Sequence, residues 1–382
     1  MAKAERLDIR DFAQIARADL TFGDLTVLVG AQGTGKSLAL QWLKVAMDGK
    51  HVIQALRDAG HTPAGIATII DLIFGVGMGA AWGDSSKVEL NGKNIDPRTV
   101  GRRGSKTERV FYIPAHRSML ISDGWAAPFQ KLTSGTPVVA RIFSQNLFDR
   151  FSARGGDKLF PVERTLKKAY RDQIDDAVFH GGKVGLEQDR QHAKRLRMTH
   201  GKTSIPFMTW TAGQREFTPL LLGLYHLLPG SKLLKRQDID WVIIEEPEMG
   251  LHPRAITVVL LLVLDLLWRG YRVVLSTHSP HVLTAIWMLR RLHEYEARWQ
   301  LVCDAFGIKA SAQVMPVAEA ALQKSYMVHA LAFEDDGKVR AKDISTLDPD
   351  DEDSAISGWG GLTELSSRFG DAVRRAVNES ER

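Results

Sequence analysis

The sequence predicts an α/β protein whose sheet-based core is interrupted by a long, mainly helical insertion. Apolar strands alternate with helical patterns near the start of the chain and again after residue 205. Between these regions, helical stretches are separated by Gly-rich turns. We therefore expect a discontinuous core over 1–50 and 205–345, an inserted helical/β lobe over 51–204, and an acidic loop with a C-terminal helix over 346–382.

Apolar spacing gives the individual elements. Runs rich in Val, Ile and Leu predict buried parallel strands at Leu25–Val29, Trp241–Glu245 and Arg272–Ser276. The apolar stretch Ile256–Trp268 contains Asp265 and is too short to cross a bilayer, which indicates a buried helix. Further helices are expected after Gly35 and over 51–60, 62–75, 161–179, 213–228 and 360–378, and further strands over 109–113, 327–333 and parts of 183–206.

Composition limits the class of protein. With 44% hydrophobic and 25% charged residues, the chain has the make-up of a folded protein. No N-terminal stretch has the pattern of a secretory signal. The single cysteine, Cys303, excludes an intrachain disulfide framework and fits a reducing compartment. We expect a cytoplasmic protein without a membrane segment.

Charge is distributed unevenly along the chain. Residues 150–202 contain 13 Lys or Arg against 7 Asp or Glu, whereas residues 334–353 contain 9 acids against 3 bases. A local basic excess of this kind attracts nucleic acid or an acidic protein. Two solvated faces of opposite sign are an equally good interpretation, and the sequence leaves both open.

A glycine-rich loop joins the first buried strand to a helix. It matches G-x-x-x-x-G-K-[ST], in which backbone N–H groups and a helix N-terminus converge on phosphates. Lys36 is expected to reach the β- and γ-phosphates, and the Ser37 hydroxyl to bind Mg²⁺. The predicted phosphate-binding residues are Gly30, Ala31, Gln32, Gly33, Thr34, Gly35, Lys36, Ser37 and Leu38.

Polar residues follow two of the predicted core strands. Glu245 and Glu246 end one strand, which places two carboxylates at the edge of the sheet beside the phosphate loop. We expect Glu245 to hold Mg²⁺ through water and Glu246 to orient the attacking water. His278 follows the next strand, where its imidazole could contact the γ-phosphate. The predicted catalytic residues are thus Lys36, Glu246 and His278.

A fourth motif brings a family resemblance. Trp210-Thr211-Ala212-Gly213-Gln214 resembles the signature segment of ABC ATPases, with Thr211 in the place of its serine and Ala212 in the place of its first glycine. The order of the motifs is that of ABC ATPases. The forms Glu-Glu-Pro-Glu-Met-Gly-Leu-His-Pro and Ser-Thr-His-Ser-Pro are most similar to those of OLD-like and AbiEii-like prokaryotic ATPases, relatives of RecF and SMC proteins.

The resemblance implies an ABC-type head, a P-loop NTPase with a mixed sheet flanked by helices. It also implies ATP and Mg²⁺ as ligands, and a homodimer or higher oligomer in which Thr211, Ala212, Gly213 and Gln214 contact the ATP bound by the other subunit. The loop expected to sense the γ-phosphate lacks glutamine, and His116 or Arg117 could replace it.

Many members of this family serve in anti-phage defence, so the resemblance implies a regulatory ATPase. The acidic run 348–353 lacks the preceding apolar strands of a nuclease site, and we expect a separate effector protein. The alternative is a RecF/SMC-like ATPase of DNA repair or chromosome maintenance that binds DNA through the basic residues of 150–202. A transporter subunit conflicts with the long insertion.

Overall fold

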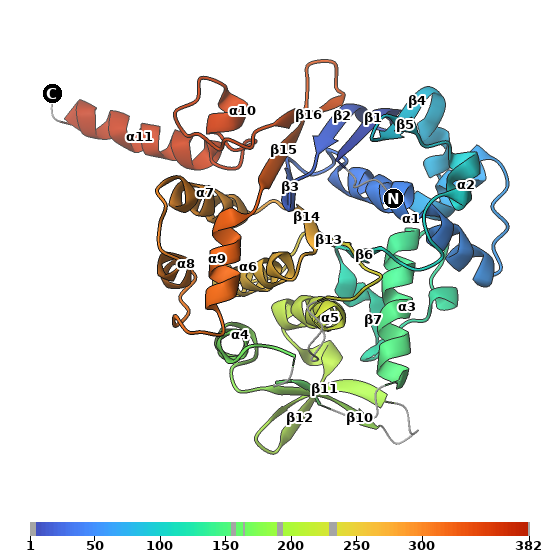
Figure 1. The fold of residues 1–382 in the computed structure, drawn as a ribbon, viewed down its shortest axis with the longest axis horizontal. Helices are drawn as coiled ribbons and strands as arrows, with labels where there is room; N and C mark the ends of the chain where they lie inside the picture. The colour runs from blue at the N-terminus through green and yellow to red at the C-terminus, as the bar shows by residue number, and fades with distance from the viewer. Residues whose placement is uncertain (1–4, 154–157, 163–164, 189–193, 229–234, 381–382) are drawn as a thin grey trace.

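The fold is built on one ten-stranded mixed sheet, ordered β5-β4-β1-β2-β16-β15-β3-β14-β13-β6 (Figure 1). The computed structural model describes residues 5–153, 158–162, 165–188, 194–228 and 235–380. In one half of the sheet, neighbouring strands are parallel: β15 (Tyr326–Phe333), β3 (Leu25–Val29), β14 (Arg272–Ser276), β13 (Trp241–Glu245) and β6 (Val110–Ile113). The predicted α/β class with a mixed sheet is confirmed.

The other half of the sheet is mostly antiparallel. It contains β5 (Lys93–Asn94), β4 (Trp82–Leu90), β1 (Arg6–Phe12) and β2 (Ile15–Thr21). Strand β16 (Val339–Asp343) joins the halves, because it runs parallel to β2 and antiparallel to β15. The turn between β1 and β2 reaches the phosphate loop, so this half supports the site.

Alternate residues of the central strands enter two separate cores. In β3, Val27 and Val29 belong to one core and Leu28 to the other; in β14, Val273 and Leu275 are separated from Val274 in the same way. This follows from the two-residue period of a strand. Both faces are buried, which explains why the sequence of each strand is almost continuously apolar.

Helices cover both faces of the sheet (Figure 1). One core contains residues of α1 (Lys36–Asp58) and α2 (Ile66–Phe74), and the other those of α5 (Ala212–Leu227), α6 (Pro253–Trp268), α7 (Pro280–Glu294), α8 (Gln300–Ala305) and α9 (Met315–Gln323). Helix α3 (Val138–Ala153) contributes to both. In the described part of the chain, no helix is long and apolar enough to span a membrane.

A second sheet lies apart from the first, at the bottom of Figure 1. Its order is β12-β11-β10-β9, with β9 (Lys158–Phe160), β10 (Lys183–Gln188), β11 (Lys194–His200) and β12 (Thr203–Pro206) all antiparallel to their neighbours. The remaining elements are the pair β7 (Ile121–Ser122) and β8 (Trp125–Ala126), and helices α4 (Lys168–Ile174), α10 (Ser354–Ser357) and α11 (Glu364–Ser380). Short helical turns are η1 (Met78–Ala81), η2 (Pro97–Arg102), η3 (Arg117–Leu120), η4 (Phe129–Lys131), η5 (Asp175–Phe179) and η6 (Phe207–Thr209).

Part of the stretch expected to form the inserted lobe lies in the large sheet. Strands β4, β5 and β6 fall within 51–204, yet β4 pairs with β1 and β6 pairs with β13. The stretch expected as helix over 161–179 is helical from Lys168 on, and residues 163–164 lie outside the described residues. The helices expected after Gly35 and over 51–60 are one helix, α1, with non-helical dihedral angles at Asp48.

A buried ion cluster explains the irregularity in α1. Lys44 and Asp48 are fully buried, and Lys44 Nζ lies 2.9 Å from both Asp48 and Glu108. The Asp48 carboxylate also accepts hydrogen bonds from the backbone N–H groups of Arg109 and Val110 at 3.0 and 2.8 Å. Because an unpaired buried charge is costly, this cluster fixes the start of β6 against α1.

Candidate nucleotide site

The phosphate loop, residues 30–35, connects β3 to α1 at the carboxyl edge of the sheet. Gly30 has φ +142°, and a Cβ there would lie 2.1 Å from the Leu331 carbonyl oxygen of β15. Gly33 has φ +78° with nothing within 4 Å of a Cβ, so only its backbone conformation requires glycine. The loop is therefore shaped by close packing on one side and is open on the other.

Lys36 lies folded over this loop. Its Nζ donates hydrogen bonds to the carbonyl oxygens of Gly30 at 2.8 Å and Ala31 at 2.9 Å. Burial lowers the pKa of Lys36 to about 8, although the negative charges of Glu246 and Glu248 oppose this shift. The ammonium group is thus held where phosphate oxygens would meet it.

Two further side chains hold the loop. The Thr34 hydroxyl donates to the Ala31 carbonyl at 2.9 Å, and Gln14 Nε2 donates to the Gly33 carbonyl at 2.7 Å. Gln14 lies in the turn between β1 and β2 and was not found by sequence reasoning. Nothing in the motif indicates it, because its contact depends on the pairing of distant strands.

Glu245 ends β13 and is only 5% exposed. Its Oε2 accepts a hydrogen bond from the Ala115 N–H at 3.1 Å, while Oε1 has no hydrogen-bond partner among the described residues. Burial raises the pKa of Glu245, whereas the hydroxyl groups of Ser37 and Tyr112 act in the opposite direction. A buried carboxylate oxygen without a partner, beside the Ser37 hydroxyl, fits a hard cation with oxygen ligands such as Mg²⁺.

Glu246 turns away from the strand. Its φ is +40°, and its N–H donates to the Ser276 carbonyl of β14 at 2.9 Å. Its Oε1 lies 3.5 Å from Nε2 of His278. The Glu246 side chain is 29% exposed and that of His278 is 30% exposed. The left-handed backbone directs this carboxylate out of the sheet edge toward the histidine, so the two predicted catalytic side chains meet.

Glu248 connects the two strand ends. Its Oε1 accepts hydrogen bonds from the Thr277 hydroxyl at 2.7 Å and from the His278 backbone N–H at 2.6 Å. The Thr277 backbone N–H in turn donates to the Leu28 carbonyl of β3 at 3.0 Å. Sequence reasoning gave Glu248 no role, although its place two residues after Glu246 is a signal that could have been followed.

The structure corrects the expectation that Arg117 could sense the γ-phosphate. The residue is fully buried, and its guanidinium group donates to the backbone carbonyls of Glu216 at 3.0 Å, Glu245 at 3.1 Å and Pro114 at 3.3 Å. Burial lowers its pKa to about 10. With its donors occupied by the backbone, Arg117 fixes the loop after β13. His116 is exposed and remains the candidate.

The signature-like segment forms the N-terminus of α5. Thr211 and Gln214 cap the helix reciprocally: Thr211 Oγ1 accepts from the Gln214 N–H at 3.3 Å, and Gln214 Oε1 from the Thr211 N–H at 3.2 Å. A Cβ on Gly213 would lie 2.9 Å from the Gly250 carbonyl oxygen. Thr211 and Ala212 are exposed, and none of the hydrogen bonds of the described residues joins this segment to residues 30–37.

In the basic segment 150–202 and the acidic segment 334–353, some of the described charged side chains form ion pairs. Arg197 of β11 lies 3.0 Å from Glu187 of β10, and Arg340 pairs with Glu334 and Asp336 at 2.7 and 2.8 Å. In the acidic run 348–353, Asp353 caps α10. Arg154, Arg164 and Arg190 lie outside the described residues. Nucleic-acid binding by 150–202 stays a prediction.

The mixed sheet flanked by helices, the P-loop between β3 and α1 and the carboxylates that end β13 together define an α/β fold with a phosphate-loop motif at the carboxyl ends of its parallel strands. A family model described as "AAA domain, putative AbiEii toxin, Type IV TA system" matches residues 143–284. This match includes Thr211, Glu245, Glu246 and His278 and begins C-terminal to the P-loop. No curated protein matches the chain.

Several solved structures are similar to the chain. An SMC head bound to the C-winged helix domain of ScpA has 12% identity and a TM-score of 0.44 over 90% of this chain and 97% of its own. The SMC head domain from Thermotoga maritima has 12% identity and a TM-score of 0.37, with coverage of 90% and 99%. A bacterial ABC transporter cassette, described as dimeric, has 11% identity and a TM-score of 0.32, with coverage of 72% and 89%.

Proposed function

We propose that the chain binds and hydrolyses ATP. The observation that carries the proposal is the meeting of Lys36, Glu245 and Glu246 at one edge of the sheet, where the Ser37 hydroxyl affects the pKa of Glu245 and the charge of Glu246 affects that of Lys36. A cation over an open loop, an unpaired buried carboxylate oxygen and a half-exposed carboxylate are the groups that phosphoryl transfer to water requires.

ATP binding would use the phosphate loop. Its backbone N–H groups and the N-terminus of α1 meet the phosphates. Lys36 would exchange the carbonyl oxygens of Gly30 and Ala31 for oxygens of the β- and γ-phosphates. Gln14 and Thr34 would keep the loop in place during this exchange. Gln14 binds the Gly33 carbonyl, which Lys36 does not contact, and Thr34 still donates to the Ala31 carbonyl when Lys36 leaves it.

Ser37 and Glu245 are the residues that would hold Mg²⁺, which when bound neutralises negative charge on the phosphate oxygens. Ala115 holds one carboxylate oxygen of Glu245 through its N–H and leaves the other available. This division of the two oxygens gives the carboxylate a fixed orientation, as metal-binding carboxylates require.

Hydrolysis would depend on Glu246. Its carboxylate accepts a hydrogen bond from a water molecule and orients it toward the γ-phosphorus. The water oxygen would bond to the γ-phosphorus as the bond from that phosphorus to the oxygen of the β-phosphate breaks. The water would give a proton to Glu246, which would pass it to the phosphate formed, and ADP and inorganic phosphate would leave. His278, with Nε2 3.5 Å from Glu246, would contact the γ-phosphate and thereby link nucleotide state to the start of α7.

A second copy of the chain would complete the site. The N-terminus of α5 is exposed and carries the same type of anion-binding donors as the phosphate loop. Because this segment makes no hydrogen bond to residues 30–37 of its own chain in the described residues, we assign Thr211, Ala212, Gly213 and Gln214 to ATP held by the other copy, in a homodimer.

We further propose that this ATPase controls a separate effector protein in prokaryotic anti-phage defence. The support is the family model over 143–284, whose description names a toxin of a toxin–antitoxin system. The test is a pull-down of tagged Glu246→Gln protein from native cells, with Lys36→Ala as control. A stoichiometric protein partner that differs between the two variants supports the proposal. DNA without such a partner contradicts it and favours a role in DNA maintenance.

The ATPase proposal itself is tested by phosphate release from the purified full-length chain with ATP and Mg²⁺. We expect Lys36→Ala to lose ATP hydrolysis, because the phosphate loop no longer holds ATP, and Glu246→Gln to bind ATP but hydrolyse it at least about 100-fold more slowly. Lys309→Ala is the matched control, because Lys309 is an exposed lysine outside the site. Near-normal turnover by Lys36→Ala would overturn the assignment.

A further inference from the structure

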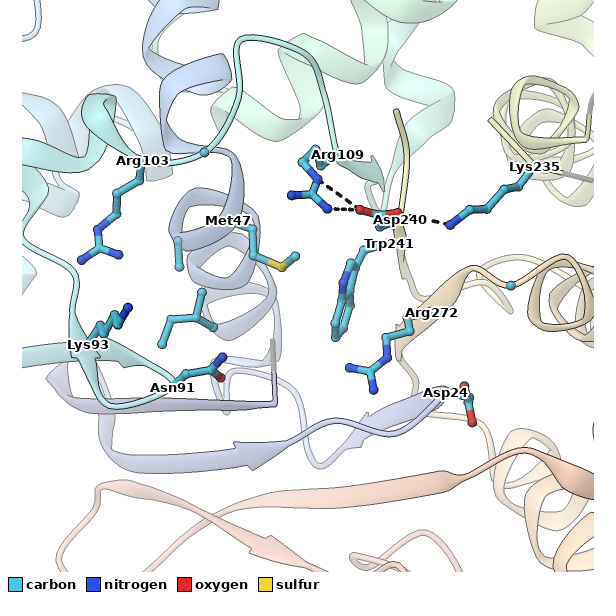
Figure 2. Close-up of a pocket in the computed structure, with 14 residues that line it drawn as sticks. Asp24, Met47, Asn91, Lys93, Arg103, Arg109, Lys235, Asp240, Trp241 and Arg272 are labelled. Carbon is cyan, nitrogen blue, oxygen red and sulfur yellow. Dashed lines mark hydrogen bonds and ion pairs between the residues drawn. The ribbon is translucent and has the colours of Figure 1, made fainter. Parts of the chain in front are cut away.

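A pocket apart from the nucleotide site lies where the parallel strands of the large sheet begin (Figure 2). Its volume is about 590 Å³, and residues at or next to the amino ends of β3, β13, β14 and β6 line it, whereas the P-loop, Glu246 and His278 lie at or beyond the carboxyl ends. Ligand pockets of proteins typically measure roughly 300–1,000 Å³. The size is that of a small-molecule site.

Residues 103–104 form one wall of the pocket, and contacts with α1 hold their backbone in place. Gly104 has φ +79°, and a Cβ there would lie 2.3 Å from the Met47 carbonyl oxygen, so the loop touches α1. The Lys50 N–H donates to the Arg103 carbonyl at 2.7 Å. A Cβ on Gly104 would also lie 3.4 Å from the Cα of Asp48, which belongs to the buried cluster with Lys44 and Glu108. The cavity is therefore bounded by fixed backbone.

Basic side chains stand on two sides of the pocket. Lys93 and Arg103 form one side, and the Arg103 guanidinium donates to the carbonyl of Asn94, the residue after Lys93. Figure 2 shows Arg109, Lys235 and Arg272 across from them. With Asp24 and Asp240 as the acids, five bases face two acids, a net charge of +3.

The acids are already engaged. Asp240 accepts hydrogen bonds from Arg109 and from Lys235, which together outweigh the effect of burial and lower its pKa. The Asp24 carboxylate accepts hydrogen bonds from the backbone and side chain of Ser325 at 3.0 and 2.8 Å. Both carboxylates are therefore committed to protein donors, and the remaining field in the pocket is positive.

An apolar floor separates the two basic sides. Ala46, Met47 and Leu90 also line the cavity, and Figure 2 shows the Met47 side chain between Arg103 and Trp241. Met47 and Leu90 are half-buried, so part of their apolar surface faces the cavity. A site of this kind suits a ligand with an apolar or planar part over the floor and anionic groups beside the bases.

We propose that this pocket is a second ligand site, which binds a small organic phosphate of the nucleotide class. The concave shape favours a small molecule over nucleic acid, which requires an extended basic surface. The inference does not rest on the proposed ATPase function, because the pocket uses other residues and the other edge of the sheet. Helix α1 begins at Lys36 and lines the pocket with Ala46 and Met47, so one element touches both sites.

The test uses the full-length Lys36→Ala protein, in which the P-loop site is impaired. Equilibrium dialysis with labelled ADP, without Mg²⁺, should show saturable binding of one molecule per chain, and inorganic pyrophosphate should compete. Lys93→Glu and Arg103→Glu, each added to Lys36→Ala, should weaken ADP binding about tenfold or more. Lys309→Glu, an exposed charge reversal elsewhere, should leave it unchanged.

Three other outcomes would contradict the proposal that this pocket binds an organic phosphate. Absence of saturable ADP and pyrophosphate binding to Lys36→Ala protein overturns the proposal, as does binding that both charge reversals leave unchanged. Arg103-dependent binding of a DNA oligonucleotide, without ADP binding, assigns the surface to nucleic acid instead. Lys93 is exposed on a short edge strand, so Lys93→Glu remains informative should Arg103→Glu fail to fold. Loss of ATP hydrolysis in Lys36→Ala tests the P-loop assignment, and that result does not affect the test of the pocket.

Discussion

The Thr277 hydroxyl donates a 2.7 Å hydrogen bond to Oε1 of Glu248, which joins the loop after β13 to the tip of β14. The same oxygen accepts the N–H of His278 at 2.6 Å. Glu248 therefore holds the backbone from which the His278 side chain reaches Glu246. It is a positioning residue, since it acts on the proposed chemistry through His278.

Substitutions of Glu248 should distinguish the effect of its hydrogen bonds from the effect of its negative charge. We expect Glu248→Ala to lower kcat for ATP by about 10- to 100-fold with a smaller effect on KM, because His278 loses its support. Glu248→Gln keeps an oxygen that can accept both hydrogen bonds and should retain most of the activity. Steady-state phosphate release measures both variants. Equal losses in the two would show that the charge of Glu248, rather than its hydrogen bonds, is what matters.

The lowered pKa of Lys36 predicts that ATP binding weakens at alkaline pH. In the free protein this pKa is about 8, so the ammonium is charged at pH 7 and mostly neutral at pH 9. If ATP binds the charged form, its Kd should rise about tenfold between these pH values. Fluorescence titration with a labelled ATP analogue measures this change. Lys36→Met provides the control, because any residual binding should lack this pH dependence; a flat profile for the unsubstituted protein would contradict the expectation.

Glu245 predicts a dependence on Mg²⁺. We expect EDTA to abolish hydrolysis, and Glu245→Gln to require at least about tenfold more Mg²⁺ for half-maximal activity, because the unpaired Oε1 loses its negative charge. Titration of activity with Mg²⁺ at fixed ATP measures the shift. An unchanged Mg²⁺ requirement in Glu245→Gln would remove this residue from the metal site.

The central strands could be predicted from the sequence because their signal is local. Leu25–Val29, Trp241–Glu245 and Arg272–Ser276 have the predicted bounds, since a buried strand is mostly apolar and stops at a glycine or a polar residue. The phosphate loop is equally local, because its motif fixes the loop between strand and helix. The chemical roles of Glu246 and His278 stay predictions, although the structure brings the two side chains together.

The parts that could not be predicted depend on distant partners. Arg117 looks like a free cation in the sequence, yet it is buried because the carbonyls of Glu216 and Glu245 surround it. Strand β4 belongs to the large sheet through its pairing with β1, whose paired residues lie 70 to 83 positions earlier. Neither relationship leaves a pattern within a sequence window, since each is decided by tertiary packing.

Arg117 therefore predicts an effect on stability. Arg117→Met should lower the free energy of unfolding by about 3 kcal/mol, because it leaves buried carbonyls without donors and removes the positive charge among Glu216, Glu245 and Glu248. Urea denaturation followed by circular dichroism measures the change. Arg57→Met, at an exposed position near the end of α1, should stay within about 0.5 kcal/mol of the unsubstituted protein. A loss below about 1 kcal/mol for Arg117→Met would mean that water replaces the guanidinium.

The most specific prediction concerns the proposed ATP site, which the P-loop of one chain and the Thr211 segment of a second chain would form together. Lys36→Ala impairs the P-loop, and Thr211→Arg places a long cation at the exposed N-terminus of α5, so each variant alone should be inactive. In a mixture, heterodimers contain one site with an intact P-loop facing an intact Thr211 segment, and the other site carries both defects. Equal mixing of the two inactive proteins should therefore recover about a quarter of the normal activity, since half of the dimers are mixed and each has one working site. Mixtures that stay inactive, together with unsubstituted chains that hydrolyse ATP at dilutions where they are monomeric, would show that one chain contains the complete site.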